Sequence, residues 1–95
     1  MRFEWDHAKA RANVRKHAVS FEEASSIFRG FYIERRDVRR DYGETRFVAL
    51  GVDSNGVVLN VVYTLRGEIV RIISAWRASR HEREAYAKAQ PDRAL

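Results

Sequence analysis

Three runs rich in β-branched residues, separated by two tight turns, constrain the fold of this 95-residue chain more than any other feature. The runs span residues 45–52, 57–65 and 68–76, and the turns are marked by Asn55-Gly56 and Arg66-Gly67. Val, Ile, Thr and aromatic residues favour strands, and Asn-Gly between two such runs is a strong hairpin signal. The pattern therefore predicts three consecutive antiparallel strands.

The two turns also predict which side chains share a face, because directly paired residues lie on the same side of a sheet. Two-residue loops at the turns place eight apolar side chains on one side, which is expected to be the core: Val48, Leu50, Val52, Leu59, Val61, Tyr63, Val70 and Ile72. The mixed character of the other side predicts a shallow groove, partly covered by the last helix, with Phe47, Ala49, Gly51, Asn60, Val62, Thr64, Ile69, Arg71, Ile73 and Ala75.

Two short helices are predicted before these strands. Residues 3–5 read as a short strand that ends at Asp6, whose side chain can cap a helix over residues 7–17. Ser20 and Glu23 have the spacing of a capping box. The second helix has an apolar stripe, ends at Gly30 and is followed by a strand at 31–34 and a charged loop at 35–44; the stripe is Phe21, Ala24, Ile27 and Phe28.

A third helix is predicted after the sheet. Ser79 and Glu82 form a second capping box, and the helix continues to about Gln90, with residues 91–95 as a frayed tail after Pro91. A chain of this length has surface for one core. Residues 1–95 are therefore expected to form a single α+β domain: a helical hairpin packed on one face of a mainly antiparallel sheet, with a C-terminal helix.

The charge of the chain indicates an anionic partner. The net charge is +5, and 15 of the 18 basic residues are arginine, which binds phosphate bidentately and stacks on bases. A GC-rich genome is the alternative cause of the arginine bias. No cysteine is present, so disulfides and thiolate ligands are excluded, and no metal or cofactor is expected. Neither a membrane span nor a secretory signal is apparent, so a bacterial cytoplasmic location is expected.

The remaining candidate functional residues have side chains that can bind phosphate or stack on bases. They are Lys9, Lys16, His17, Arg66, Arg71, Arg77, Arg80 and Arg83, with the aromatic residues Trp5, Trp76 and Tyr86. Such a set can bind RNA. It can also cleave RNA, if one group accepts the 2′-hydroxyl proton, arginines stabilise the charge on the phosphate, and another group protonates the leaving oxygen.

Several of these residues also have a structural interpretation. The first helix can turn Ala10, Val14 and His17 to the core, and its polar line of Lys9, Asn13 and Lys16 is either a solvated face or a phosphate-contacting stripe. His17 can cap the dipole of that helix, and Glu82 is a capping residue first. Trp5 can pack at the core edge. The four arginines of the charged loop can bind phosphates, or the loop can be mobile and solvated.

Three phrases together resemble the BrnT family of type II toxins, which are small ribonucleases of RelE-like fold. The phrases are FEWDHAKARANVRKHAVSFEEA (3–24), LNVVYT (59–64) and RGEIVRIISAWRASRHEREAY (66–86). Two positions depart from the family pattern. Ala18 stands where members often have Gly, and Trp76 stands where a small or basic residue is common.

The resemblance implies a metal-independent endoribonuclease that cleaves mRNA, inhibits translation and is neutralised by a BrnA-like antitoxin. That antitoxin carries a ribbon-helix-helix part, through which the complex contacts operator DNA and represses its own operon. By motif, the implied site residues are Lys9, Asn13, Lys16, His17, Arg66, Arg77, Glu82 and Tyr86, with Arg80 in the same block.

The sequence thus leads to two hypotheses. The first is a ribonuclease whose groove lies between the first helix and residues 77–86. Its expected catalytic residues are Lys16, His17, Arg66, Arg77, Arg80 and Glu82, and its expected RNA-binding residues are Lys9, Asn13, Arg71, Trp76, Arg83 and Tyr86. The second is a non-catalytic module that binds RNA or an antitoxin.

Overall fold

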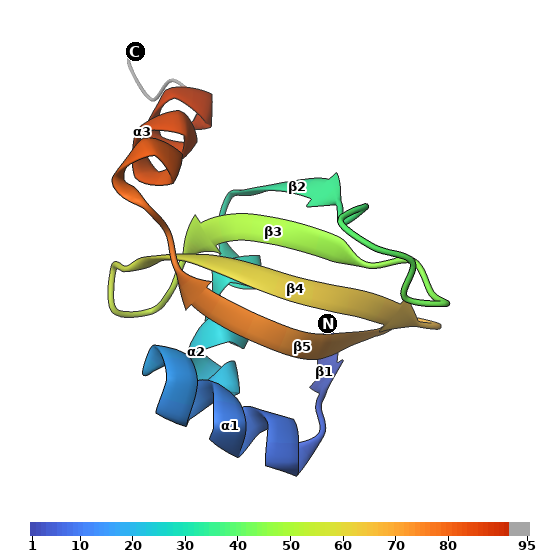
Figure 1. Ribbon diagram of the computed structural model, residues 1–95. Coiled ribbons are helices and arrows are strands. Elements are labelled where there is room, and N and C mark those ends of the chain that lie inside the picture. Colours follow the sequence, from blue (N-terminus) through green and yellow to red (C-terminus); the bar gives the residue numbers. More distant parts are fainter. Residues whose placement is uncertain (92–95) are drawn as a thin grey trace.

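A five-stranded sheet organises the computed structural model, which describes residues 1–91 (Figure 1). The strands follow the order β1-β5-β4-β3-β2, and only the β1–β5 pair is parallel. The strand bounds are β1 Arg2–Glu4, β2 Tyr32–Arg36, β3 Phe47–Val52, β4 Val58–Arg66 and β5 Ile69–Arg77. The predicted mainly antiparallel sheet is confirmed. Most of the tail expected at 91–95, residues 92–95, lies outside the described residues.

The helices lie on two sides of the sheet. Helices α1 (His7–His17) and α2 (Phe21–Ser25), the latter continued by the 3₁₀ helix η1 (Ser26–Arg29), cover one face. Helix α3 (Arg80–Ala89) lies beyond the opposite face (Figure 1). This arrangement confirms the helical hairpin and the C-terminal helix. The face without α1 and α2 is called the open face below.

The helix starts follow the side chains that the sequence provides. The Asp6 carboxylate accepts a hydrogen bond from Lys9 N–H at the start of α1. Ser20 and Ser79 each accept from the backbone three residues later, while Glu23 and Glu82 accept from the backbone N–H of Ser20 and Ser79. Both predicted capping boxes are therefore present.

The turn between β3 and β4 is one residue longer than predicted. Asp53 N–H donates to Val57 O at 2.8 Å, and the Asp53 carboxylate accepts from the N–H groups of Asn55 and Val57. The loop therefore contains Ser54, Asn55 and Gly56, with Gly56 at φ 82°. A third loop residue shifts the pairing by one, so that Leu50 faces Asn60 and Ala49 faces Val61.

This shift reverses the predicted faces of β3, because a one-residue slip turns every side chain over. Phe47, Ala49 and Gly51 lie on the helix-covered side, whereas Val48, Leu50 and Val52 lie on the open face. On β4 the prediction is correct, since Leu59, Val61 and Tyr63 belong to the main core. The predicted core of β3 was therefore wrong, and that of β4 was right.

The β4–β5 pair contains a β-bulge that the sequence did not predict. The turn is Gly67-Glu68, so Tyr63 pairs with Ile72 rather than with Val70. Beyond it, Val62 pairs with Ser74, which leaves Ile73 as an extra residue on β5. The extra residue moves Ala75 to the core side, where it is fully buried.

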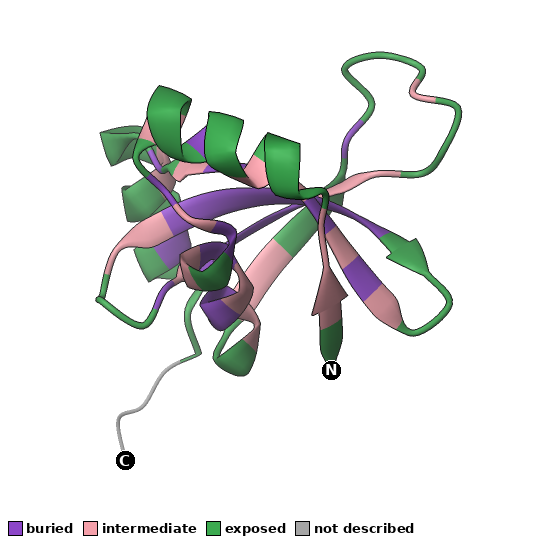
Figure 2. Ribbon diagram, turned by 90° about the horizontal axis from the view of Figure 1, so that it is seen from below, coloured by how far each residue is buried: buried purple, intermediate pink, exposed green. Residues whose placement is uncertain are grey.

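The core lies mainly between the sheet and the helical hairpin. Its buried members are Val19, Phe21, Ala24, Ile27, Ala49, Leu59, Val61, Tyr63, Val70, Ile72 and Ala75. A smaller cluster of Leu50, Ala78 and Tyr86 joins α3 to the other side of the sheet. Figure 2 shows burial concentrated on the strands, whereas α1 is exposed over most of its surface. Val14, expected in the core, is 48% exposed.

The charged segment after β2 is mostly exposed, as expected for a solvated loop, and it is also closed by hydrogen bonds. Asp37 N–H donates to Arg46 O at 2.8 Å, which closes a loop over residues 37–46. Thr64 Oγ1 donates to Thr45 O, so the loop is also tied to β4. We call this segment the 37–46 loop. Among the described residues, no helix is long and apolar enough to cross a membrane.

Candidate nucleic-acid interface

Side chains from three distant parts of the chain meet around Trp76, near the end of β5. The His17 ring, from the last turn of α1, lies 6.1 Å from the Trp76 ring between centroids. The Arg39 guanidinium, from the 37–46 loop, lies 5.7 Å from the Trp76 ring centroid. An arginine over an indole is a favourable cation–π contact. Together with Lys16, which precedes His17 on α1, these residues form what we call the Trp76 surface.

Asn13 fixes the position of α1 beside this surface. Its Nδ2 donates to Ala75 O at 2.8 Å and to Val19 O at 2.9 Å, and its Oδ1 accepts from Ala75 N–H at 3.1 Å. The residue is only 6% exposed. Both polar atoms of its side chain are therefore occupied, and the expectation that Asn13 binds RNA does not fit its position. Burial of Asn13 instead of Val14 also rotates the predicted faces of α1.

The end of α1 exposes its basic residues. Arg15, Lys16 and His17 form the last turn, and Ala18 follows in the left-handed conformation at φ 57°. Ala18 N–H donates to Val14 O at 2.9 Å, which completes the helix terminus. Cations at this position are favoured by the negative end of the helix dipole. Lys16 is exposed and His17 is half-buried. Lys9 is exposed on the first turn of α1, away from this end.

Arg77 follows Trp76 but points to the other side of the sheet. It pairs with Leu59, a core residue, so its side chain lies on the helix-covered side. There its charge is one of the influences that lower the pKa of Glu23, after the hydrogen bonds from Ser20. Trp76 and Arg77 thus lie on opposite sides of β5 at the end nearest α1, and Arg77 is exposed.

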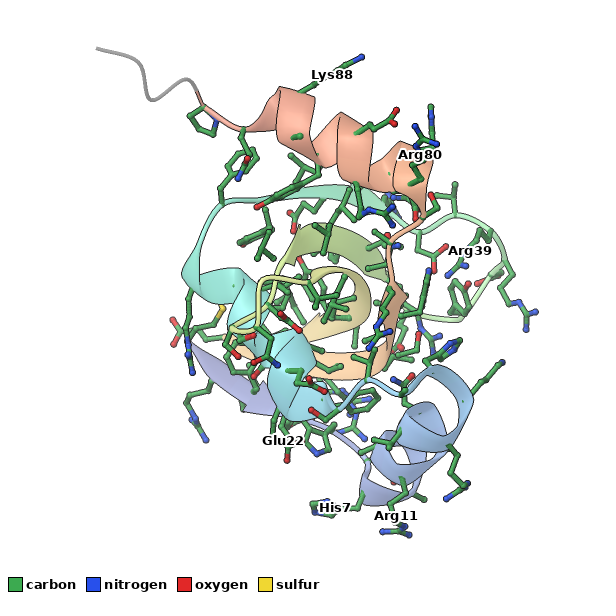
Figure 3. The ribbon with its side chains drawn as sticks, turned by 90° about the vertical axis from the view of Figure 1, so that its left-hand side faces the viewer. His7, Arg11, Glu22, Arg39, Arg80 and Lys88 are labelled. Carbon is green, nitrogen blue, oxygen red and sulfur yellow. The ribbon has the colours of Figure 1, made fainter. Side chains whose placement is uncertain are left out.

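The arginines of α3 are close to this end of the sheet but are partly engaged. Arg80 is exposed and pairs with Glu84 one turn later at 3.2 Å (Figure 3). Arg83 Nη1 donates to Ala78 O at 3.1 Å. Because an exposed ion pair contributes little free energy, Arg80 can still bind an anion. Arg83 is instead engaged with the backbone where β5 leads into α3.

Glu82 and Tyr86 have structural partners. The Ser79 N–H, the Asn60 amide and the charge of Arg35 hold the pKa of Glu82 below its usual range. Tyr86 is 4% exposed, and its hydroxyl donates to Phe31 O at 2.7 Å. The burial of Tyr86 does not fit its expected role in base stacking. Glu82 as an ionised capping carboxylate lacks the proton that a general acid must donate.

Arg66 and Arg71 lie toward the opposite end of the sheet. Arg66 pairs with Ile69 at the β4–β5 turn, seven residues along β4 from the partner of Arg77, which is a span of about 23 Å. Arg71 Nη1 forms an ion pair with Glu4 at 2.7 Å. The strand length therefore separates Arg66 from Arg77, which the prediction had grouped in one site with Arg80.

The 37–46 loop contains Arg39, one of the four loop arginines that could bind phosphates by sequence, which the expected site did not include. Arg39 donates through Nε and Nη2 to the Asp37 carboxylate, both at 2.8 Å, and Tyr42 Oη donates to the same carboxylate at 3.1 Å. These contacts hold the pKa of Asp37 far below its usual range and raise that of Arg39. An Asp followed two residues later by Arg, directly after a strand, was the available signal.

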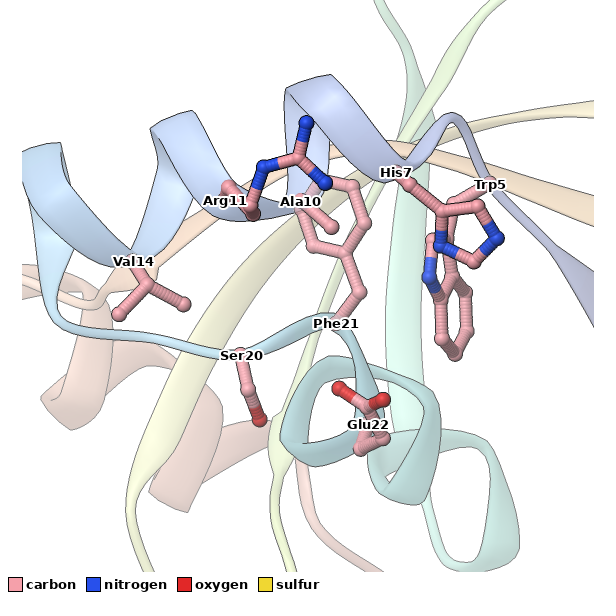
Figure 4. Close-up of a pocket in the computed structure, with 8 residues that line it drawn as sticks. All are labelled: Trp5, His7, Ala10, Arg11, Val14, Ser20, Phe21 and Glu22. Carbon is pink, nitrogen blue, oxygen red and sulfur yellow. The ribbon is translucent and has the colours of Figure 1, made fainter.

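One pocket lies away from the Trp76 surface. An open pocket of about 250 Å³ lies between α1 and the start of α2 (Figure 4), lined by Trp5, His7, Ala10, Arg11, Val14, Ser20, Phe21 and Glu22. Trp5 packs edge-on against Phe21 at 5.9 Å, which supports its interpretation as a residue at the core edge. Within residues 1–91, no three His, Asp or Glu side chains are grouped as metal ligands.

Comparisons with known proteins bear on this fold and site. No curated protein sequence matches the chain. A crystal structure of the ribonuclease toxin BrnT from Brucella abortus has the same fold, with a TM-score of 0.63 and 23% identity over 84% of this chain and 99% of that one. A family model described as "Ribonuclease toxin, BrnT, of type II toxin-antitoxin system" matches residues 5–82.

The fold and the family match define a ribonuclease toxin of a type II toxin–antitoxin system. The matched segment contains both α1 and the Trp76 surface, and it ends at Glu82 in the first turn of α3. The chain belongs to the BrnT family. The RelE-like classification within the α+β class stays a prediction.

Proposed function

We propose that the protein is an endoribonuclease that cleaves mRNA beside Trp76 and thereby inhibits translation. The observation that carries this proposal is the contact between the His17 and Trp76 rings, because it places an imidazole at the strand end that Arg77 also occupies. An imidazole can transfer protons, an arginine can stabilise phosphate charge, and an indole can stack on a base. The family description supports the class of reaction.

The proposed reaction begins when the 2′-oxygen of a ribose attacks the adjacent phosphorus. His17 takes the 2′-hydroxyl proton, with Lys16 as the alternative base. Arg77 and Arg80 stabilise the negative charge that accumulates on the phosphate oxygens. The bond from phosphorus to the 5′-oxygen breaks, and a proton is delivered to that oxygen. The products are a 2′,3′-cyclic phosphate and a new 5′-hydroxyl end. No metal takes part in this proposed route.

The proposed site differs from the set expected from sequence. Lys16, His17, Trp76, Arg77 and Arg80 are retained because they lie at one end of the sheet. The residues left out are either occupied by structural partners or located elsewhere on the sheet or helices: Lys9, Asn13, Arg66, Arg71, Glu82, Arg83 and Tyr86. Arg77 and Trp76 on opposite sides of β5 imply that the RNA backbone passes around the end of the strand.

We propose further that a BrnA-like antitoxin with a ribbon-helix-helix part neutralises the toxin in the bacterial cytoplasm. The complex would reach operator DNA through the antitoxin and repress its own operon. Membership of a family described as toxins of type II systems supports an antitoxin partner. The net charge of +5 suits a partner of acidic character.

The test is cleavage of a synthetic RNA by the purified protein, with and without EDTA. His17→Ala and Arg77→Ala are expected to lower the rate by about 100-fold, the usual loss for a positioned acid–base or charge-stabilising group. A 2′,3′-cyclic phosphate on the upstream product is expected. Loss of cleavage on chelation contradicts the metal-free route, and unchanged activity in Arg77→Ala contradicts the site.

A non-catalytic module is the second candidate. The observation that favours it is the engagement of Glu82, since this carboxylate caps α3 and accepts from Asn60 rather than facing His17. RNA binding without cleavage by the purified protein supports this candidate. Growth arrest in cells that express the protein alone, lost in His17→Ala, argues against it.

A further inference from the structure

The 37–46 loop presents one arginine in a fixed orientation toward the Trp76 surface. Its first residue, Asp37, is buried, and its carboxylate side chain is only 1% exposed. A buried carboxylate needs compensating partners. It has four here: Arg39 Nε, Arg39 Nη2, the Tyr42 hydroxyl and the Arg39 backbone N–H, the last at 3.3 Å. Asp37 is itself held in place, because its backbone N–H donates a hydrogen bond to Arg46 O and so closes the loop.

These contacts leave one edge of the Arg39 guanidinium without a partner. Asp37 takes the Nε and Nη2 groups, and within residues 1–91 Nη1 donates no hydrogen bond. The Arg39 side chain is 59% exposed. A guanidinium has five N–H donors in a rigid fork, so a carboxylate on one edge leaves a second edge for another anion. The face of the group is fixed as well, because it lies over Trp76.

We propose that Arg39 binds a phosphate of the RNA next to the scissile one, and that Asp37 is the positioning residue that orients it. The inference rests on the proposed ribonuclease function and adds a substrate contact to it. Arg39 and His17 both contact the Trp76 ring, so the phosphate at Arg39 lies one side chain away from the proposed base. A fork held in advance loses little side-chain entropy when phosphate binds.

A general electrostatic role predicts a different result from this positioning role. Replacing Asp37 by Asn raises the net charge from +5 to +6. If charge alone governed RNA binding, the variant would bind more tightly. If Asp37 acts by holding Arg39, the variant binds more weakly, because the guanidinium loses its fixed orientation. The sign of the change therefore separates the two roles.

The test uses a fluorescein-labelled, mixed-sequence RNA of about 20 nucleotides, in a fully 2′-O-methylated form for binding and an unmodified form for cleavage. Arg39→Lys keeps the charge but loses the fork, and it is expected to weaken binding about fivefold to tenfold, with a similar loss of cleavage rate. Arg40→Lys is the matched control in the same loop and is expected to bind and cleave normally. Asp37→Asn is expected to bind about fivefold more weakly.

Each result decides between these roles. Equal binding by Arg39→Lys and Arg40→Lys overturns the inference, and so does tighter binding by Asp37→Asn. If Asp37→Asn melts at a much lower temperature than the unaltered protein, the comparison of Arg39→Lys with Arg40→Lys alone tests the inference. An unaltered protein that neither binds nor cleaves RNA overturns the proposed function itself. A third outcome is that the unaltered protein cleaves RNA, His17→Ala abolishes cleavage and Arg39→Lys leaves it intact. This outcome overturns only the proposed role of Arg39.

Discussion

The side-chain amide of Asn13 pairs with both backbone groups of Ala75, 62 positions along the chain, as a neighbouring strand would. Strand β1 pairs with β5 only as far as Arg71, so the edge of β5 is open beyond that point. Asn13 therefore satisfies the exposed edge of β5 and attaches α1 to it. An open edge is a site of unwanted strand pairing, and one amide removes part of it.

Asn13→Ala is expected to lower the free energy of unfolding by about 3 kcal/mol, because it leaves buried backbone groups of Ala75 and Val19 without partners. Urea denaturation measures the change. Arg15→Ala, an exposed substitution on the same helix, is the control and is expected to stay within about 0.5 kcal/mol of the unaltered protein. Equal stability of the two variants would show that the Asn13 contacts contribute little.

Ala18→Gly is expected to stabilise the protein by about 1 kcal/mol, because Ala18 has a positive φ that glycine adopts without strain. Ala12→Gly, inside α1, is the matched control and is expected to destabilise by about 1 kcal/mol. Thermal unfolding of both variants checks the opposite signs. Two shifts in the same direction would contradict the left-handed conformation at position 18.

Gly51→Ala is expected to destabilise the protein by about 1–3 kcal/mol, the usual cost of overpacking. An added Cβ would lie 3.1 Å from the Cβ atoms of both Ile27 and Tyr32, which are held by their own backbones. Gly30→Ala is the control, since its Cβ would meet nothing within 4 Å. A denaturant titration in which both variants unfold alike would show that η1 can move away from β3.

Glu82 makes stability depend on pH. Its pKa in the folded protein is lowered, chiefly by the Ser79 N–H, so the ionised carboxylate stabilises the fold above its unfolded pKa of about 4.3. That contribution is lost as the pH falls through the folded pKa. Glu82→Gln is therefore expected to show a smaller loss of stability than the unaltered protein between about pH 6 and pH 3, by urea titration. Parallel curves would contradict the assignment.

The separation of Arg66 from Arg77 predicts unequal effects on activity. Arg77→Ala is expected to slow RNA cleavage by about 100-fold, whereas Arg66→Ala, about 23 Å away, is expected to change it by less than about threefold. Both variants remove one exposed positive charge from β4 or β5. Single-turnover cleavage assays make the comparison. Equal losses would mean that the RNA extends along the whole length of β4 and β5.

Local signals in the sequence predicted the helices well and the sheet register less well. Asp6, Ser20 and Ser79 marked the starts of α1, α2 and α3, because capping depends on residues three apart. The faces of β3 depended on one loop residue. Asn55-Gly56 indicated a two-residue turn, but the Asp53 carboxylate holds a longer one, and this side-chain contact was not visible in the residue pattern.

The candidate site was predicted in part for a similar reason. His17, Trp76 and Arg77 could be chosen by residue type, and they lie at one end of the sheet. Asn13 was misjudged because a polar residue on a helix gives no sign of a backbone partner 62 positions away. Arg39 was left out of the expected site because the charge-rich 37–46 loop lacks periodicity, although Asp37 holds its side chain in one orientation.

Because of the bulge at Ile73, the number of residues in β5 determines which side chains reach each face of the sheet, as much as their identity does. Side chains alternate along a strand, so a β5 of the same length that paired regularly, without the bulge, would exchange the sides to which Trp76 and Arg77 point. The indole would then enter the layer under the helices, and the guanidinium would face the 37–46 loop. Insertion or deletion of one residue between the bulge and Trp76 should thus be far more damaging to activity than substitution of Ile73, whereas deletion of Ile73 itself would keep the pairing of Trp76 and Arg77. A library of β5 variants with one residue inserted or deleted, scored for toxicity, would show at which positions the register of the strand matters.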